Sequence, residues 1–86
     1  MVSIESAAEK EMKRMEEVFA EIKVADDKGK EFYDFARNYF DDGRHFFEKE
    51  MFVEAFEAFI ISWAYLDIGL KLGYFETQLK KYFTCD

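Results

Sequence analysis

The stretch ISWAYLDIGLKLGYF, residues 61–75, decides the fold of this chain. It continues an uncharged run that starts at Ala58, and a single carboxylate, Asp67, ends that run. Apolar residues recur here every three or four positions, which is the period of an α-helix. Gly73 follows as a typical residue for ending a helix. The pattern predicts a long helix over residues 52–72 whose surface is apolar nearly all round.

Two further segments carry the same helical period. The first covers residues 3–24 and the second residues 28–49, with the capping residue Asp26 or Asp27 between them. Gly43 falls inside the second segment, yet the apolar spacing keeps its phase through it. We therefore expect one continuous helix, in which the glycine allows a bulky ring of a neighbouring helix to come close. No sustained period-two alternation is present, so no strand is predicted.

Three helices of about 20 residues joined by short turns place neighbours antiparallel. The sequence thus predicts an all-α, up-down-up three-helix bundle that forms one domain over residues 1–86. A short C-terminal helical tail, residues 74–83, is expected to fold back through Phe75, Leu79 and Phe83. The turn at 49–51 is the least well marked, because it has neither Gly nor Pro.

Composition narrows the class of protein. Aromatic residues make up 20% of the chain, which suits a small domain that needs a dense core. Cys85 is the single cysteine, so no internal disulfide is available and a reducing, cytoplasmic setting is expected. The net charge of −7, with the basic residues scattered, argues against nucleic acid. No targeting signal and no uninterrupted apolar run of membrane-spanning length appear, so no membrane partner is expected.

The third helix carries a second apolar stripe that a three-helix bundle does not need. Its residues are Ile61, Tyr65, Ile68 and Leu72, beside Ala64 on the expected outward face. A helix that is apolar all round is normally buried, so something further should cover this stripe. The tail, a second copy of the chain, or another protein could do so. We interpret these five residues as an interface, most simply that of a homodimer.

Asp67 lies at the edge of this excess apolar surface. Lys71 stands one turn further on, so an i,i+4 ion pair is available, and Arg37 or Arg44 of the second helix offers another partner. A paired Asp67 would fix the register of the helices. The alternative is a small-ligand pocket in which Asp67 and Lys71 lie near Trp63 and Tyr74.

Catalytic and metal-binding patterns are weak. His45, the sole histidine, shares a helix face with Asp41 and Glu48, but these could hold a cation only with help from another helix. Ser62 has no histidine near it in the sequence, and no Gly-rich phosphate loop is present. The sequence therefore predicts no catalytic residue, no cofactor and no metal site.

Residues 39–75 resemble an archaeal family known as domain of unknown function 357. The resemblance rests on Tyr39, Phe40 and Asp41, followed by an Ala-rich helix with Ala55, Ala58, Trp63, Leu66, Asp67, Gly69, Leu72 and Gly73. The chain departs from the family pattern at residues 49–51, where a Gly-Asp turn is expected. The resemblance implies a spectrin-like or albumin-binding-like three-helix bundle in an archaeal cytoplasmic protein, without an established activity. A non-enzymatic interaction module that self-associates through the third helix is the function we expect, with a small-ligand-binding or enzyme-accessory domain as the alternative.

Overall fold

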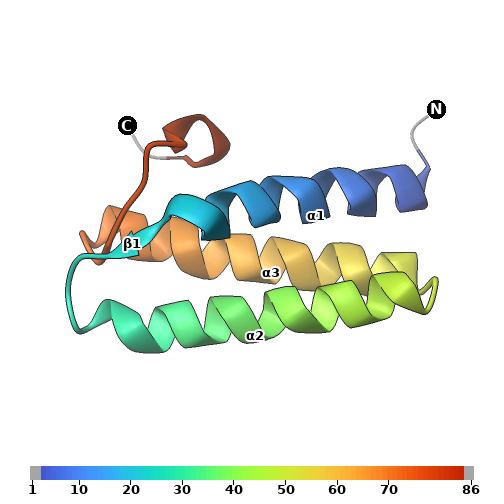
Figure 1. The fold of residues 1–86 in the computed structure, drawn as a ribbon, viewed down its shortest axis with the longest axis horizontal. Coiled ribbons are helices and arrows are strands. Elements are labelled where there is room, and N and C mark those ends of the chain that lie inside the picture. The colour runs from blue at the N-terminus through green and yellow to red at the C-terminus, as the bar shows by residue number, and fades with distance from the viewer. Residues whose placement is uncertain (1–2, 85–86) are drawn as a thin grey trace.

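The computed structural model describes residues 3–84 and confirms the up-down-up three-helix bundle. Helix α1 spans Ile4–Glu21, α2 spans Gly29–Glu48 and α3 spans Phe52–Lys71. In Figure 1, α3 runs between α1 and α2, and the chain reverses direction at each end of the bundle. Helix α3 packs most extensively against α2 and also covers α1, whereas α1 and α2 touch less. Within these residues, no helix is both long and apolar enough to cross a membrane.

Two short strands correct the expectation that the chain has none. Strand β1, Lys23–Val24, pairs antiparallel with β2, Phe75–Glu76. Helix α1 therefore ends three residues before the predicted position, because the backbone becomes extended at Ile22 to enter β1. The pairing ties the α1–α2 connection to the chain that leaves α3, and the amide of Ala25 adds a bond to the carbonyl of Tyr74 at 2.8 Å.

The C-terminal tail, residues 74–84, is less helical than predicted. After β2 it contains only a single 3₁₀ turn, Lys80–Tyr82. Phe75 and Phe83 are nevertheless buried in the core, as the sequence pattern indicated. The tail lies beside the C-terminal part of α1 (Figure 1).

Local capping explains where the helices start and stop. The Ser3 side chain accepts a bond from the Ser6 amide at 3.0 Å and so caps α1. Asp26, rather than Asp27, receives the amide of Lys28 at 2.9 Å just before α2. After α3, Gly73 adopts a φ of 77°. Its amide and that of Tyr74 then bond back to the carbonyls of Leu70 and Gly69, which is a Schellman ending.

The end of α2 has the same backbone geometry as the end of α3, but a glutamate takes the place of the glycine. Glu50 has a φ of 62°, in the left-handed region that favours glycine. The amides of Glu50 and Met51 bond to the carbonyls of Phe47 and Phe46, at 3.0 and 2.9 Å. This is the turn at which the sequence departs from the expected Gly-Asp pattern. Glu50 thus occupies a position whose backbone would suit glycine.

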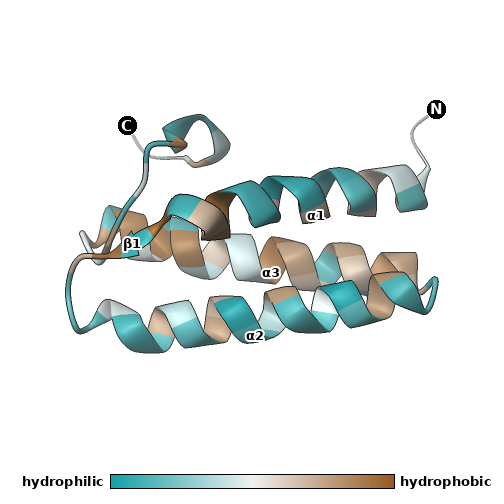
Figure 2. Cartoon of the chain, in the orientation of Figure 1, coloured by the Kyte–Doolittle hydropathy of each residue, from teal (hydrophilic) through white to brown (hydrophobic). Residues whose placement is uncertain are grey.

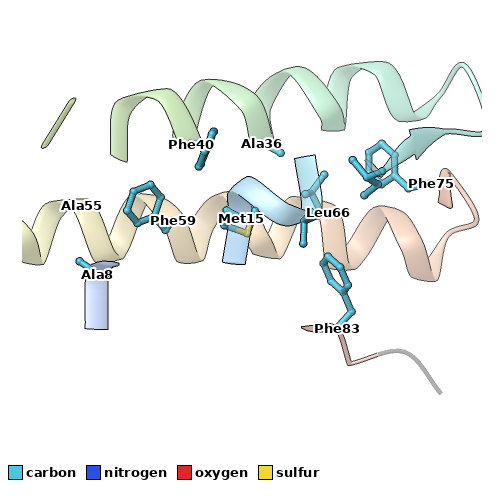
Figure 3. Close-up of a cluster of buried hydrophobic side chains, with 11 residues drawn as sticks. Ala8, Met15, Ala36, Phe40, Ala55, Phe59, Leu66, Phe75 and Phe83 are labelled. Carbon is cyan, nitrogen blue, oxygen red and sulfur yellow. The ribbon is translucent and has the colours of Figure 1, made fainter. Parts of the chain in front are cut away.

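The core runs along the length of α3 and receives side chains from α1, α2 and the tail (Figure 3). Its buried members are Ala8, Met15, Val18, Ile22, Ala36, Phe40, Ala55, Phe59, Leu66, Phe75 and Phe83. Small residues in α2 and α3 make room for the large rings. The Phe59 ring covers Gly43, and the Phe75 ring covers Gly69. A ring of the tail therefore occupies the space beside Gly69.

Candidate functional site

The side of α3 that points away from both neighbouring helices is largely apolar. This outer face of α3 consists of Val53, Glu54, Glu57, Ile60, Ile61, Ala64, Ile68, Lys71 and Leu72. The exposed fractions of Ile61, Ile68 and Leu72 are 40, 48 and 54%. Figure 2 shows that α3 is apolar along most of its length, whereas α1 and α2 are mainly hydrophilic. Apolar side chains grouped in this way often mark interaction surfaces.

The tail does not cover this face, which corrects one of the three covers considered from the sequence. Its anchoring contacts are instead with α1 and with the side of α3 that carries Trp63 and Asp67. Ile61, Ile68 and Leu72 remain exposed with the tail in place. The described part of the tail therefore does not provide the cover that the sequence pattern predicted.

Tyr65 differs from the other predicted interface residues because it is already packed within the chain. Its ring stacks on Phe35 and Tyr39 of α2, with centroids 5.3 and 6.0 Å apart, and meets the Phe32 ring edge-on at 6.1 Å. Phe35 is itself exposed and lies next to the outer face. Tyr65 therefore joins α2 to α3 and extends the apolar surface toward Phe35.

A shallow groove of about 330 Å³ lies between α2 and α3 next to this face. Its lining residues are Tyr39, Asp42, Phe46, Glu54, Glu57, Ala58 and Ile61. Rings and aliphatic groups alternate here with three carboxylates. Sequence reasoning missed the contribution of α2, although Tyr39, Asp42 and Phe46 follow a helical spacing of three and four that places them on one face.

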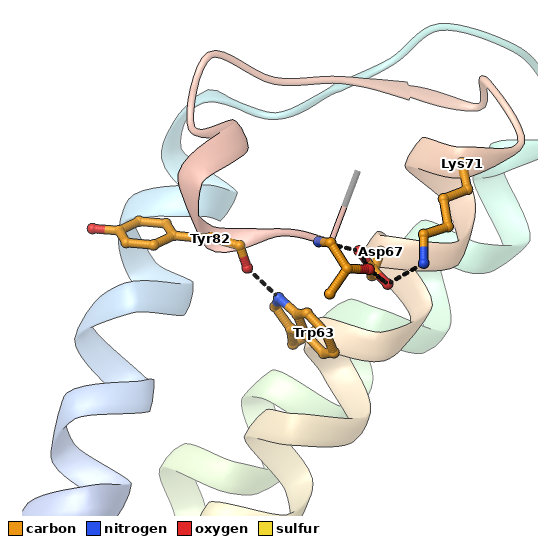
Figure 4. A network of polar contacts seen from close by, with 5 residues as sticks. Trp63, Asp67, Lys71 and Tyr82 are labelled. Atoms are coloured by element: carbon orange, nitrogen blue, oxygen red, sulfur yellow. Dashed lines mark hydrogen bonds and ion pairs between the residues drawn. The ribbon is translucent and has the colours of Figure 1, made fainter. Parts of the chain in front are cut away.

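Asp67 is held by the tail. Its Oδ1 accepts the backbone N–H of Thr84 at 3.0 Å, and both of its oxygens contact the Thr84 hydroxyl, at 3.0 and 2.8 Å (Figure 4). The predicted ion pair with Lys71 is present at 3.3 Å. The predicted alternatives were wrong, because Arg37 and Arg44 both pair with Asp41.

These contacts decide the protonation of Asp67, which is only 6% exposed. Burial by itself would raise the pKa of its carboxyl group. The hydrogen bonds from Thr84 and the ion pair with Lys71 outweigh that effect, so the pKa lies below its usual value. Asp67 is therefore a charged, fully engaged anchor for the tail.

Trp63 is the second anchor on α3. Its ring N–H donates to the carbonyl of Tyr82 at 2.6 Å (Figure 4). Its ring also lies parallel to that of Phe83, with centroids 6.2 Å apart. Tyr74 takes its contacts elsewhere, against Phe32 of α2 at 5.5 Å. The tail thus occupies the polar groups of Trp63 and Asp67 that the predicted ligand pocket would have used, and Tyr74 packs against α2.

Anchors on α1 complete the attachment of the tail. Glu21 accepts bonds from the Thr77 hydroxyl and from the Gln78 amide, the latter at 2.6 Å. Glu17 accepts the Tyr82 hydroxyl at 2.5 Å, and this bond raises the pKa of Tyr82. No pattern in the sequence pointed to these pairs, since each joins residues more than fifty positions apart.

The remaining polar candidates are engaged in structural contacts. Ser62 donates to the carbonyl of Ala36 at 2.6 Å, inside the α2–α3 contact. Asp41 pairs with Arg44 at 3.0 Å, beside His45 on the surface of α2. Over residues 3–84, no group of three or more His, Cys, Asp or Glu side chains is placed to hold a metal ion.

Comparison with known proteins identifies the family. The model of the family described as "Protein of unknown function (DUF357)" matches residues 5–75. The chain belongs to the DUF357 family. Among solved structures, it is similar to the crystal structure of protein AF1782 from Archaeoglobus fulgidus, a DUF357 protein. The two chains are 35% identical with a TM-score of 0.75, over 87% of this chain and 93% of the other. The curated proteins contain no match.

The DUF357 match includes the outer face of α3 but not the residues that fasten the tail. All of α3, including its outer face, lies within residues 5–75. The match stops before Thr77, Tyr82 and Thr84, the residues that fasten the tail to α1 and α3. The outer face therefore lies within the part of the chain that the family model matches, whereas most of the tail lies beyond it.

Proposed function

We propose that this DUF357 protein is a non-enzymatic helical interaction module that assembles with a second copy of itself through the outer face of α3. One observation carries the proposal: Ile61, Ile68 and Leu72 lie 40 to 54% exposed on a helix whose other sides are covered by α1, α2 and the tail. Burying apolar surface contributes about 25 cal/mol per Å². Association through this face would therefore remove an unfavourable exposure that the single chain leaves in place.

The charges on this face support a second copy as the partner. Glu57 and Lys71 stand at opposite ends of a row that contains Ile61, Ala64 and Ile68, spaced 4, 3, 4 and 3 along the helix. We call these five residues the α3 seam. A fitting partner must offer a base against Glu57, an acid against Lys71 and aliphatic groups between them. The α3 seam of another copy offers all three.

The test of self-association is the oligomeric state. Size-exclusion chromatography with light scattering, run over a wide range of protein concentrations, should report a dimer for the wild-type chain. The double variant Ile61→Glu with Ile68→Glu should be a folded monomer, because two carboxylates would be desolvated in the contact. Circular dichroism checks the fold, since both side chains are already exposed in the single chain.

A matched control separates this effect from a general loss of apolar surface. Ile4 and Val24 are exposed to a similar degree but lie outside α3. The double variant Ile4→Glu with Val24→Glu should therefore remain dimeric. A wild-type chain that stays monomeric at the highest concentration would overturn the proposal, as would a control that dissociates as readily as the seam variant.

A further inference from the structure

Resting on the self-association proposed above, we infer that two copies pair α3 against α3 in an antiparallel register centred on Ala64. In this arrangement Lys71 of each copy meets Glu57 of the other. The inference concerns the geometry of the contact, and it can fail while the self-association stands.

The spacing of the α3 seam fixes the centre of the contact. Glu57 and Lys71 each lie seven residues from Ala64, on opposite sides of it. At 1.5 Å per residue this is a rise of about 10 Å in either direction. A two-fold axis at Ala64 therefore brings each Glu57 level with a Lys71, and it brings Ile61 beside Ile68. Ala64 itself meets its own copy, and its small side chain allows the close approach typical of packed helices.

The charges select this orientation over a parallel one. A parallel pair in the same register would set Glu57 against Glu57 and Lys71 against Lys71, and such like-charge contacts are costly. Lys71 already bonds Asp67 at 3.3 Å, but its side chain remains half exposed and an ammonium group has three donors. It can therefore contact Asp67 within its own chain and Glu57 of the other.

The groove between α2 and α3 supports the same register. Among the large apolar residues that the structure describes, Leu72 is the most exposed, at 54%. The two-fold axis brings it level with residues 56 and 57, next to the groove that Tyr39, Phe46 and Ala58 help to line. Asp42, Glu54 and Glu57 surround this groove and would face the Lys71 that accompanies Leu72. The second copy thus supplies both an apolar group and a cation to a groove that offers rings and carboxylates.

Cysteine cross-linking tests the register. In a Cys85→Ser background, Ala64→Cys places one thiol per chain at the inferred axis, where the two Cα atoms can come within disulfide range of about 4.4–6.8 Å. Mild oxidation should convert most of this variant to a covalent dimer. Glu57→Cys is the matched control, because its two copies would lie about 20 Å apart in the antiparallel register and adjacent in a parallel one.

Charge reversal gives an independent readout. Glu57→Lys should weaken the dimer about tenfold in Kd, measured by sedimentation equilibrium, and adding Lys71→Glu should restore most of that loss. Trp63 fluorescence, measured alongside, reports whether Lys71→Glu has disturbed the neighbouring tail.

Two results would overturn the register and leave self-association intact. One is a cysteine pattern in which the Glu57→Cys variant cross-links as readily as the Ala64→Cys variant, as a parallel pair requires, or in which Ala64→Cys does not cross-link at all. The other is a charge-reversed double variant that dimerises more weakly than Glu57→Lys alone. A monomeric wild-type chain would overturn both the register and the self-association.

Discussion

The ring of Phe59 fills the space that a side chain at Gly43 would need. A Cβ atom at residue 43 would lie 2.5 Å from Cε1 of Phe59, and both residues are buried. The fit explains why α2 continues through a residue that weakens helices. The cost of the glycine within the helix, about 1 kcal/mol relative to alanine, is offset by the contact of α2 with α3.

Gly43→Ala is therefore expected to destabilise the protein although alanine favours the helix. The added methyl group forces the Phe59 ring to shift, at a cost of about 1–3 kcal/mol, part of which the better helix propensity offsets. Urea unfolding monitored by circular dichroism measures the change. Adding Phe59→Leu should make the effect of Gly43→Ala smaller or favourable. A more stable Gly43→Ala single variant would contradict the contact.

Glu50→Gly is expected to stabilise the chain by about 0.5–1 kcal/mol. Glu50 has a φ of 62° in the turn between α2 and α3, and glycine adopts this conformation without the strain that a side chain introduces. Thermal unfolding should show a higher Tm. The same substitution at Glu54, an exposed position inside α3, should instead cost about 1 kcal/mol. Equal effects at both positions would contradict the role of the backbone conformation.

Asp67→Asn should destabilise the protein near neutral pH by about 1.5–3 kcal/mol, the range for hydrogen bonds to charged groups. The pKa of Asp67 in the folded chain lies below its usual value of 3.8. Its contacts therefore contribute stability above that pH, and the contribution is lost as the pH falls through the folded-state pKa. The difference in unfolding free energy between wild type and variant should be constant near neutrality and shrink below about pH 3.8.

Thr84→Val is the partner variant for this test. It removes the hydroxyl contacts to Asp67 but keeps the backbone N–H bond. Its effect should consequently be smaller than that of Asp67→Asn and should shrink over the same pH interval. If the difference in unfolding free energy between wild type and either variant stays constant down to the lowest accessible pH, the charge of Asp67 does not hold the tail.

Phe83→Ala should release the tail before the bundle unfolds. Phe83 is 8% exposed and its ring lies parallel to that of Trp63. Truncation of a buried Phe lowers the free energy of unfolding by about 3–5 kcal/mol. Here the decrease should be smaller, because the tail can detach while the three helices stay folded. Since Trp63 is the single tryptophan, its fluorescence should shift to longer wavelength while helical circular dichroism is largely kept. Unchanged fluorescence would contradict this role of Phe83.

The helices were predictable because their signals are local. The period of three and four, the phase kept through Gly43 and the helix end at Gly73 each depend on neighbours within a few turns. A ring was expected to approach Gly43, and Phe59 does so. The Asp67–Lys71 pair was predictable for the same reason, as an i,i+4 contact.

The tail and its anchors were not predictable in this way. Strands of two residues are too short to show alternation, so β1 and β2 left no pattern. The bonds that Thr77 donates to Glu21 and that Thr84 donates to Asp67 join residues 56 and 17 positions apart, and no spacing rule connects such pairs. The side of α3 to which the tail returns depends on these bonds. The tail therefore lies over Trp63 and leaves the outer face open, contrary to one of the expectations.

The way α1 is held has a consequence for biosynthesis. The first of the three helices to leave the ribosome packs mainly on α3, the last of the three, and is then fastened by Glu17 and Glu21 to Tyr82 and Gln78 of the tail. α2 and α3 can form a hairpin as soon as both have emerged, while α1 must wait until α3 and the tail have been translated. We therefore expect the docking of the earliest helix to come late in the folding of the nascent bundle.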